Sequence, residues 1–553
     1  MKRPAGVWNA VGLRSALALV VIGALLISEA ILSHVFAIAW SGTYGWQRVL
    51  AIVLGAGAIV AGAIRLWQLW SGWPSQQAVS GFRRRWMPFL VAAAVYFLAF
   101  TFLDPFPQGD QPHYELESVG LAYDQTVDMT VNYTDPSRFS LMFPTGVPDE
   151  HAYRYKRGGE LVPIQNVGLP LLLAPAVPWV EEIEVLSPTR HLWPWNIEII
   201  LMAALAAQLL YRILLRLRPQ HPRLVAGVWA SVVFSPSMVV YASQVFPEMP
   251  AALLALVAVD ALMKPPTRRS ITIGAGALAL MPWLHVRFLP ISAVLAIGLA
   301  IRASAAPPAV LHGGAARARR AAWAIAPLLL SLVVMGIAFE HWYGSFLPNA
   351  QYRLPQTRQP QTLSASWTAL TGAFWSSQDG WLPLAPVCIL ALATIGYAVR
   401  RYRAWALFGL AAAAAYLLNL TIEGSNQGFS FAGRYTVVLM PFAAIPLLIA
   451  AVDLARVRWL LWPLAVFTWY LTVAIALEPP LPVAGSPSVG GPTYPQLLWP
   501  WFVNLWPQIV PSAAHFYPDA GAVIAWSAGL FAVSVAGYFA VPRLARRARP
   551  AGR

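Results

Sequence analysis

The stretch NIEIILMAALAAQLLYRILLRLR, residues 196–218, decides the class of protein, because it joins an apolar run of bilayer length to a basic end. A helix needs about 20 mostly apolar residues to cross the hydrocarbon core of a membrane. Arginines gathered at one end of such a run are typical of the cytoplasmic end of a transmembrane helix. We therefore expect residues 193–214 to cross a membrane and to end in the cytoplasm.

The composition of the whole chain agrees with this interpretation. The 553 residues are 58% hydrophobic and only 11% charged, and the net charge is +15, whereas soluble domains carry about 25% charged residues. A net charge this high would indicate nucleic-acid binding in a soluble protein, but no basic stretch interleaved with aromatic residues forms a separate soluble module here. Cys388 is the single cysteine, so an intrachain disulfide and a cysteine-based metal site are both excluded.

Fourteen apolar runs have the length or position of membrane spans. With the N-terminus inside, the basic clusters of seven loops all fall on the cytoplasmic side, as the positive-inside rule requires. The first run is about twice as long as the core of a signal peptide, so we expect a retained helix. The runs joined at Pro282–Arg287 are short, and a re-entrant pair or one broken helix stays open. The predicted spans are 16–40, 47–66, 87–103, 193–214, 224–243, 248–263, 271–284, 288–301, 322–340, 383–399, 405–421, 435–452, 459–477 and 521–541.

The fold class predicted is therefore an all-α polytopic membrane protein with about 14 transmembrane helices. A large outside loop, residues 104–192, is expected to carry short interfacial helices, and 13 of the chain's 23 acidic residues lie between positions 104 and 190. We divide the chain into an N-terminal two-helix addition (1–86), a catalytic membrane core (87–460) and C-terminal helices (461–553) with an interfacial segment at 495–510.

The first turn of the outside loop carries the sharpest candidate for catalysis. It reads DPFPQGDQPHY, residues 104–114, so prolines and a glycine hold Asp110 and His113 at the membrane surface before a helix resumes near Tyr114. A carboxylate there suits a general base acting on a hydroxyl. A helix-capping role for Asp110 is the structural alternative. No metal site is assigned, although Asp110 with His113 leaves a divalent metal open.

Basic residues on the outside depart from the positive-inside trend and indicate an anionic partner. Arg154, Lys156 and Arg157 could bind a phosphate at the membrane surface or pair with the acids of their own loop. Arg287 lies between two apolar runs, where a charge is costly and often functional, although an arginine at a helix end can also extend its head group to the interface. Glu248 follows a proline at an outer helix start, where a helix-dipole role is the alternative.

Together these outside stretches resemble the GT-C superfamily of membrane glycosyltransferases, which includes protein O-mannosyltransferases and lipid A aminoarabinose transferases. The resemblance covers roughly residues 87–460. Gln111 stands where bacterial members commonly have Glu, and the acidic loop follows the third span rather than the first. The stretches that carry the resemblance are Asp110–Tyr114, Phe246–Pro250, Pro282–Phe288, Trp342–Asn349 and Gly433–Tyr435.

The resemblance implies inverting transfer of a sugar from a polyprenyl-phosphate donor to a hydroxyl acceptor on a glycan, lipid or protein, at the outer face of the plasma membrane, with both termini cytoplasmic. It implies no certain cofactor and no nucleic acid. The expected roles are catalysis by Asp110, His113 and Glu248, phosphate binding by Arg154, Lys156, Arg157, Arg287 and Arg434, and an acceptor or sugar pocket with Tyr114, His285 and Tyr435.

Two other classes of function stay open. A lipid or polysaccharide flippase would also have many spans, although the chain shows no internal repeat of the kind that transporters often have. A non-catalytic protein of envelope assembly would explain Gln111 in place of a carboxylate. The abundance of Ala, Arg, Pro and Trp is typical of a bacterial genome rich in G and C.

Overall fold

The computed structural model describes residues 81–103, 109–139, 152–154, 160–180, 193–305, 314–352, 370–375, 380–401, 403–423, 433–477, 505 and 520–547. The chain divides into two compact units, residues 1–94 and 95–553, and the description below concerns the second unit. Helix α3 (Gly81–Leu103) contains the boundary between them. The predicted spans 16–40 and 47–66, and the interfacial segment 495–510 apart from residue 505, lie outside the described residues.

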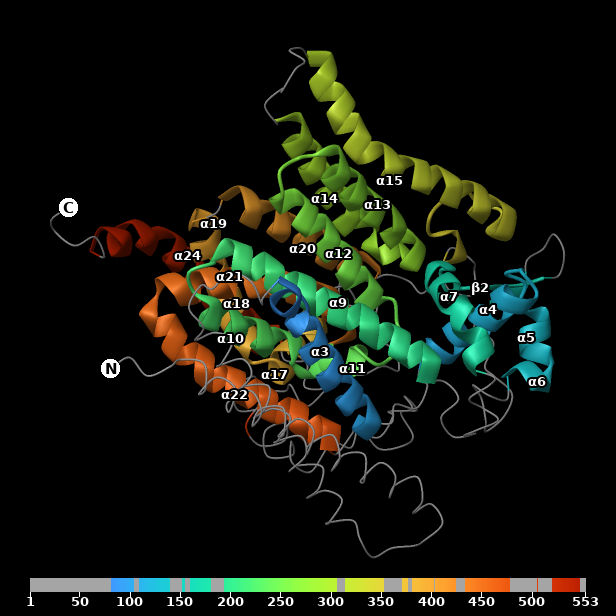
Figure 1. Ribbon diagram of the computed structural model, residues 1–553, viewed down its shortest axis with the longest axis horizontal. Helices are drawn as coiled ribbons and strands as arrows, with labels where there is room; N and C mark the ends of the chain where they lie inside the picture. The colour runs from blue at the N-terminus through green and yellow to red at the C-terminus, as the bar shows by residue number, and fades with distance from the viewer. Residues whose placement is uncertain are drawn as a thin grey trace, which may run out of the picture. The chain divides into compact units, whose positions relative to one another are not determined.

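Long apolar helices make up most of the second unit (Figure 1). Five helical segments among the described residues are long and apolar enough to cross a membrane, namely Pro194–Leu217, Val286–Ser304, Ala315–Tyr343, Arg434–Asp453 and Ala455–Ala476. The prediction of a helical, membrane-embedded protein is thus confirmed at this level. Besides α3 and the helices of the outside loop, the other long helices described are α10 (Pro222–Val233), α12 (Glu248–Met263), α13 (Arg268–Leu284), α20 (Arg403–Glu423) and α24 (Ala520–Arg547).

Proline breaks two of the predicted spans into shorter helices. The run 224–243 was expected to be one helix, but it forms α10 and α11 (Pro236–Tyr241), because Pro236 has no N–H to continue the ladder and clashes with the preceding turn. The run 383–399 forms α17 (Trp381–Leu384), α18 (Val387–Ala393) and α19 (Ile395–Arg401). Pro386 precedes α18, whereas the break between α18 and α19, at Thr394, contains no proline.

The pair of short runs around Pro282–Arg287 forms two separate helices. Helix α13 ends at Leu284, the short 3-10 helix η2 (Val286–Phe288) turns the chain, and α14 (Leu289–Ser304) follows. The two helices pack against each other and against α15 (Gly314–Tyr343). The alternative of a single broken helix is therefore wrong, and the turn holds Arg287 at a corner between the two helices.

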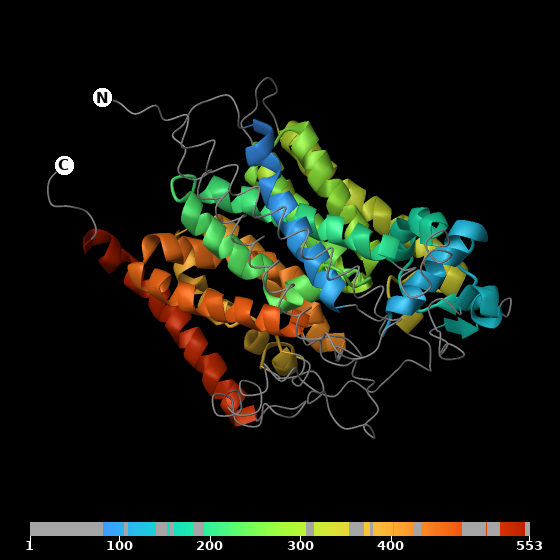
Figure 2. The same cartoon turned by 60° about the horizontal axis from the view of Figure 1, so that its bottom comes forward.

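The outside loop folds into a small layer of short elements that gathers at one end of the bundle in both Figure 1 and Figure 2. It consists of α4 (Gln111–Tyr123), α5 (Thr130–Thr134), α6 (Pro136–Phe139), α7 (Gly168–Leu173) and η1 (Ala174–Ala176). Short helices were expected here. The antiparallel pair β1 (Ala152–Arg154) and β2 (Leu161–Pro163), in which Tyr153 lies opposite Val162, was not.

Two hydrogen bonds and one close backbone approach hold this layer against α13 and α15. The hydroxyl of Tyr343 donates to the carbonyl of Pro163 at 2.8 Å, and the amide of Asn166 donates to the carbonyl of Pro282 at 3.2 Å. A Cβ on Gly168 would lie 2.4 Å from the backbone of Trp283, so only glycine allows this close approach. The loop therefore sits directly over the end of α13, beside the corner that carries Arg287.

Ion pairs gather at the C-terminal ends of α12 and α21 (Met440–Asp453). Asp260 lies 2.7 Å from Nη1 of Arg216 and also pairs with Lys264. Asp453 accepts two 3.1 Å hydrogen bonds from Nη2 of Arg218. These basic residues belong to the clusters that the sequence predicts to be cytoplasmic. Helix α9 (Trp193–Leu217), with the residue after it, is ion-paired to the C-terminal parts of both helices.

Candidate functional site

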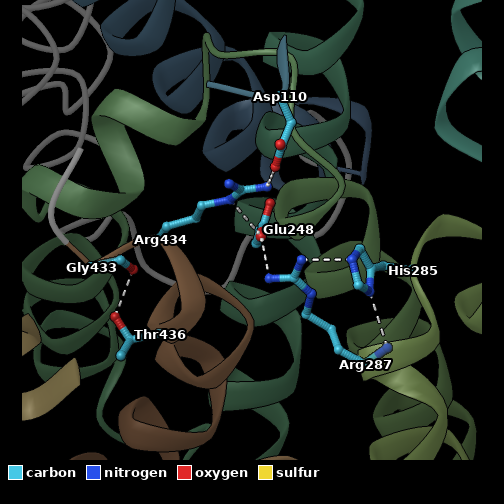
Figure 3. Close-up of polar contacts among 7 residues, drawn as sticks. All are labelled: Asp110, Glu248, His285, Arg287, Gly433, Arg434 and Thr436. Atoms are coloured by element: carbon cyan, nitrogen blue, oxygen red, sulfur yellow. Dashed lines mark hydrogen bonds and ion pairs between the residues drawn. The ribbon is translucent and has the colours of Figure 1, made fainter. Parts of the chain in front are cut away.

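Four segments that are far apart in the sequence meet where the outside loop covers the bundle. They are the turn at Asp110, the first turn of α12, the corner at η2, and the 3-10 helix η4 (Arg434–Leu439), which leads into α21. Figure 3 shows the side chains that they bring together. We call Asp110, Glu248, His285, Arg287 and Arg434 the charged cluster.

Arg434 is the centre of the charged cluster. Its Nη2 donates to Oδ2 of Asp110 at 2.9 Å, and its Nε donates to Oε1 of Glu248 at 3.0 Å. The guanidinium is almost completely buried, Glu248 is completely buried, and the Asp110 side chain keeps 30% of its surface exposed. One arginine thus bridges a closed carboxylate and a carboxylate that solvent or a substrate can reach.

Arg287 approaches the same carboxylate from the other side. Its Nη1 lies 3.6 Å from Oε1 of Glu248, and its Nη2 lies 2.6 Å from Nε2 of His285. Burial and the charges of Arg287 and Arg434 lower the pKa of His285 well below its usual value, so the ring is neutral. A neutral imidazole has one acceptor nitrogen, and it accepts from Arg287 either through Nδ1, 3.1 Å from the backbone N–H, or through Nε2. Within the described residues, Nε and Nη1 of Arg287 make no hydrogen bond. Nη1 is therefore engaged with Glu248 by charge alone, whereas Nε has neither a hydrogen-bond nor an ion-pair partner among the described residues.

Aromatic rings form the walls around the two guanidiniums. The Arg434 carbon Cζ lies 4.2 Å from the centre of the Phe246 ring, and that of Arg287 lies 4.5 Å from the centre of the Tyr435 ring. Cation–π contact stabilises a desolvated guanidinium and orients its plane. Tyr114 of α4 is also buried and interacts electrostatically with Arg434. Of the predicted pocket residues, Tyr114 and Tyr435 therefore adjoin the charged cluster, and His285 belongs to it.

The side chain of Asp110 does not cap α4. It stands at the N-cap position of that helix, but it makes no capping hydrogen bond and points to Arg434 instead. Arg287 does not extend toward water either, since it is 6% exposed. Helix capping by Asp110 and extension of Arg287 to the interface are therefore both wrong, because each side chain contacts other members of the cluster instead.

A glycine turn sets the direction of Arg434. Gly433 has φ +82°, and a Cβ at this position would lie 2.2 Å from Oγ of Ser237. Its carbonyl accepts hydrogen bonds from the N–H of Thr436 at 3.0 Å and the hydroxyl of Thr436 at 2.8 Å (Figure 3). Only glycine tolerates both the positive φ and the close neighbour, so this turn starts η4 in the direction that buries Arg434.

Other predicted residues lie elsewhere or outside the described part of the chain. His113 is buried, and its Nδ1 lies 2.7 Å from the hydroxyl of Tyr133 on α5. The backbone of Arg154 lies in β1, but its side chain is not described, and Lys156 and Arg157 fall outside the described residues. Among the residues that the structure describes, no group of three His, Cys, Asp or Glu side chains could hold a metal ion.

Two contributors to the site were not predicted from the sequence. Gln111 was noted only as a departure from the GT-C pattern, yet its amide contacts both Glu115 and the backbone of Val245. Phe246 was quoted only as part of a motif, yet its ring faces Arg434. The short spacing from Gln111 to Glu115, one helical turn, was a usable signal for the first contact.

No protein-family model matches the chain, and neither a characterised protein nor a solved structure matches it.

Proposed function

We propose that this protein transfers a sugar from a polyprenyl-phosphate-linked donor to a hydroxyl acceptor, with inversion at the anomeric carbon. The observation that carries the proposal is a carboxylate, Asp110, at the exposed edge of a buried cluster with two guanidiniums. A base that faces the acceptor and cations that face a phosphate are the two requirements of this chemistry. The resemblance of the outside stretches to GT-C enzymes supports the same conclusion.

In the proposed reaction, the acceptor oxygen attacks the anomeric carbon while the bond from that carbon to the phosphate oxygen breaks. The leaving phosphate takes the bonding electron pair, and the hydroxyl proton passes to Asp110. The ion pair with Arg434 at 2.9 Å favours the ionised carboxylate that a base requires. Glu248 is too deeply buried to meet the acceptor, so we assign it to holding the two arginines rather than to proton transfer.

The leaving phosphate gains negative charge as the bond breaks, and Arg287 offers a donor that would stabilise it. Buried polar groups are almost always hydrogen-bonded, and an unsatisfied one requires an explanation. The Nε–H of Arg287, which has no hydrogen-bond partner among the described residues, would donate to one phosphate oxygen, while Nη1 faces Glu248. The ring of His285, 2.6 Å from Nη2, would hold the guanidinium in place.

We further propose that the chain has fourteen membrane spans, with both termini in the cytoplasm and the charged cluster at the outer face of the plasma membrane. Arg216, Arg218 and Lys264 gather at the C-terminal ends of α12 and α21, which are the ends away from the charged cluster, and this supports the orientation. Labelling of single cysteines placed in each loop, in a background without Cys388, tests the orientation directly.

The reaction is tested with the purified protein, radiolabelled polyprenyl-phosphate sugars and a set of hydroxyl acceptors. Asp110→Asn should reduce sugar transfer by about 100-fold or more, since it removes the general base. Asp124→Asn is a matched control, because Asp124 lies in the same loop, pairs with Arg138 at 3.3 Å and has a side chain 31% exposed. The control should transfer sugar as the wild type does.

Three results would decide against the proposal or a part of it. Transfer unaffected by Asp110→Asn would remove Asp110 as the base. Movement of labelled lipid across vesicle membranes without any sugar transfer would favour the flippase. If neither transfer nor lipid movement is found with any donor, the non-catalytic alternative gains support.

A further inference from the structure

Gln111 forms a link between the Asp110 turn and the segment that leads into Glu248. Its Nε2 donates to Oε1 of Glu115 at 2.8 Å, and its Oε1 accepts the backbone N–H of Val245 at 3.3 Å. Gln111 is 1% exposed and Glu115 is completely buried. Both ends of the amide are therefore engaged in a place where solvent cannot replace a lost partner.

Each of the two connected segments carries one carboxylate of the charged cluster. Asp110 directly precedes Gln111 in the sequence. Val245 is followed by Phe246, whose ring faces Arg434, and Glu248 comes two residues after Phe246. A shift of α4 relative to Val245 would change the distance from Asp110 to Arg434. Gln111 is therefore one residue from Asp110, the proposed base, and Val245 is three residues from Glu248, which bonds to the same arginine, Arg434.

An amide is the side chain that this position requires. A carboxylate at position 111 could accept from Val245 but has no N–H to donate to Glu115, and its charge would be buried without a cation among the contacts of Gln111. Burying an unpaired charge is strongly unfavourable. Glu115 therefore explains why this chain has Gln at position 111, where the GT-C resemblance leads one to expect Glu.

We infer that Gln111 is a positioning residue for the proposed transfer reaction, and that Glu115 is its fixed partner. The pair holds the Asp110 turn against Val245 and so sets the proposed base relative to Arg434 and Glu248. The inference rests on the proposed function, but the link itself can be tested without any activity.

Four variants test the inference. Gln111→Met keeps the size of the side chain and removes both hydrogen bonds, and Gln111→Glu removes the donor. Glu115→Gln keeps an acceptor for Gln111. The double variant Gln111→Glu with Glu115→Gln exchanges the two groups, so that Gln at 115 donates to Glu at 111 and the N–H of Val245 keeps its acceptor.

The kinetic readout separates positioning from general structural damage. Gln111→Met should lower kcat by on the order of tenfold to a hundredfold, because small misplacements of a catalytic group have effects of this size. The KM for the donor should stay unchanged, since Gln111 does not contact Arg287 through any hydrogen bond described here. Glu115→Gln, which keeps an acceptor for Gln111, should lower kcat less than Gln111→Glu does. The double variant should recover to within a few fold of the wild type.

Ser118→Ala is the matched control, because it removes a buried hydrogen bond of the same helix, to the carbonyl of Tyr114 at 2.7 Å, without touching the link. It should leave kcat unchanged. The inference would be overturned by a wild-type kcat in Gln111→Met, by a donor KM that rises together with the loss of kcat, or by a double variant as impaired as Gln111→Glu.

Thermal unfolding of the same variants in detergent tests the link alone. Gln111→Glu should lower the unfolding temperature, and the exchange with Glu115→Gln should restore it, which is the signature of two coupled residues. If the wild type transfers no sugar but this coupling is found, the proposed function fails and the link stands. If sugar is transferred but the coupling is absent, the proposed function stands and the link fails.

Discussion

The carboxylate of Glu248 accepts the Nε–H of Arg434 at 3.0 Å, while its Oε2 makes no hydrogen bond within the described residues. Arg287 approaches the bonded oxygen to 3.6 Å from the other side. Glu248 is therefore the buried anion that allows two guanidiniums to lie close together. Without it, each arginine would be a buried charge repelled by the other.

The first prediction concerns this pairing. Glu248→Gln should lower the free energy of unfolding by about 3–5 kcal/mol, because removing one member of a buried ion pair leaves an uncompensated charge. Asp110→Asn should cost less, since the Asp110 side chain is 30% exposed and water can replace part of the contact. Denaturant unfolding of both variants in the same detergent gives the comparison. Equal stability of Glu248→Gln and wild type would contradict the role of Glu248 as the anion of the cluster.

Much of this arrangement could be predicted from the sequence, because its signals are local. Apolar runs of bilayer length predicted the helices, since burial in lipid requires them. A charge placed where it is costly drew attention to Arg287, whereas Glu248 and Arg434 were noted in the outside stretches that resemble GT-C enzymes. All three lie in one cluster. The outside turn at Asp110 was recognised by its prolines, because they interrupt a helix at a defined point.

The rest could not be predicted, because it depends on contacts between distant segments. Val245 donates to Gln111 across 134 positions, and no pattern near either residue indicates the other. His113 was expected beside Asp110, but α4 turns its ring toward Tyr133. The strand pair β1–β2 consists of three residues in each strand, which is too short for a period-2 pattern to be recognised.

The second prediction concerns the turn before Arg434. Gly433→Ala should reduce stability by about 1–3 kcal/mol, because alanine is strained at φ +82° and its Cβ would meet Ser237. In the proposed reaction it should also raise the donor KM, since η4 would begin in another direction and displace the guanidinium of Arg434.

Gly276→Ala provides the matched control for this turn. Gly276 lies inside α13, and a Cβ there would meet nothing within 4 Å. Alanine should therefore leave the protein as stable or make it slightly more stable, as expected in a helix interior. Equal effects of the two substitutions on unfolding would show that the turn at Gly433 has no special requirement.

The third prediction concerns the far ends of the helices that lead from Glu248 and Arg434. Asp260→Asn should destabilise the protein by about 1–3 kcal/mol, because the side chain is 8% exposed and pairs with both Arg216 and Lys264. Asp453→Asn should have a smaller effect, since that side chain is 20% exposed. Unfolding curves of the two variants give the order, and a larger loss for Asp453→Asn would contradict the burial argument.

The fourth prediction is a dependence of stability on pH that originates in α4. Burial raises the pKa of Glu115 to about 8, against a hydrogen bond from Gln111 that lowers it, and burial also raises the pKa of Glu117 well above its usual value. Folded Glu115 therefore keeps its proton where an unfolded glutamate, with a pKa near 4.5, loses it. Its contribution to stability is complete below the unfolded pKa and decreases as the pH rises to about 8.

Unfolding temperatures measured from about pH 5 to about pH 9 should therefore decrease in the wild type, by an amount equivalent to a few kcal/mol in total. Glu115→Gln should make the curve flatter, and Glu115→Gln with Glu117→Gln should make it flatter still, because a neutral amide has no proton to lose. Ser118→Ala, which changes the same buried helix without removing a titrating group, should keep the wild-type slope. A wild-type slope in the double variant would place the pH dependence outside α4, because neither carboxylate would remain to cause it.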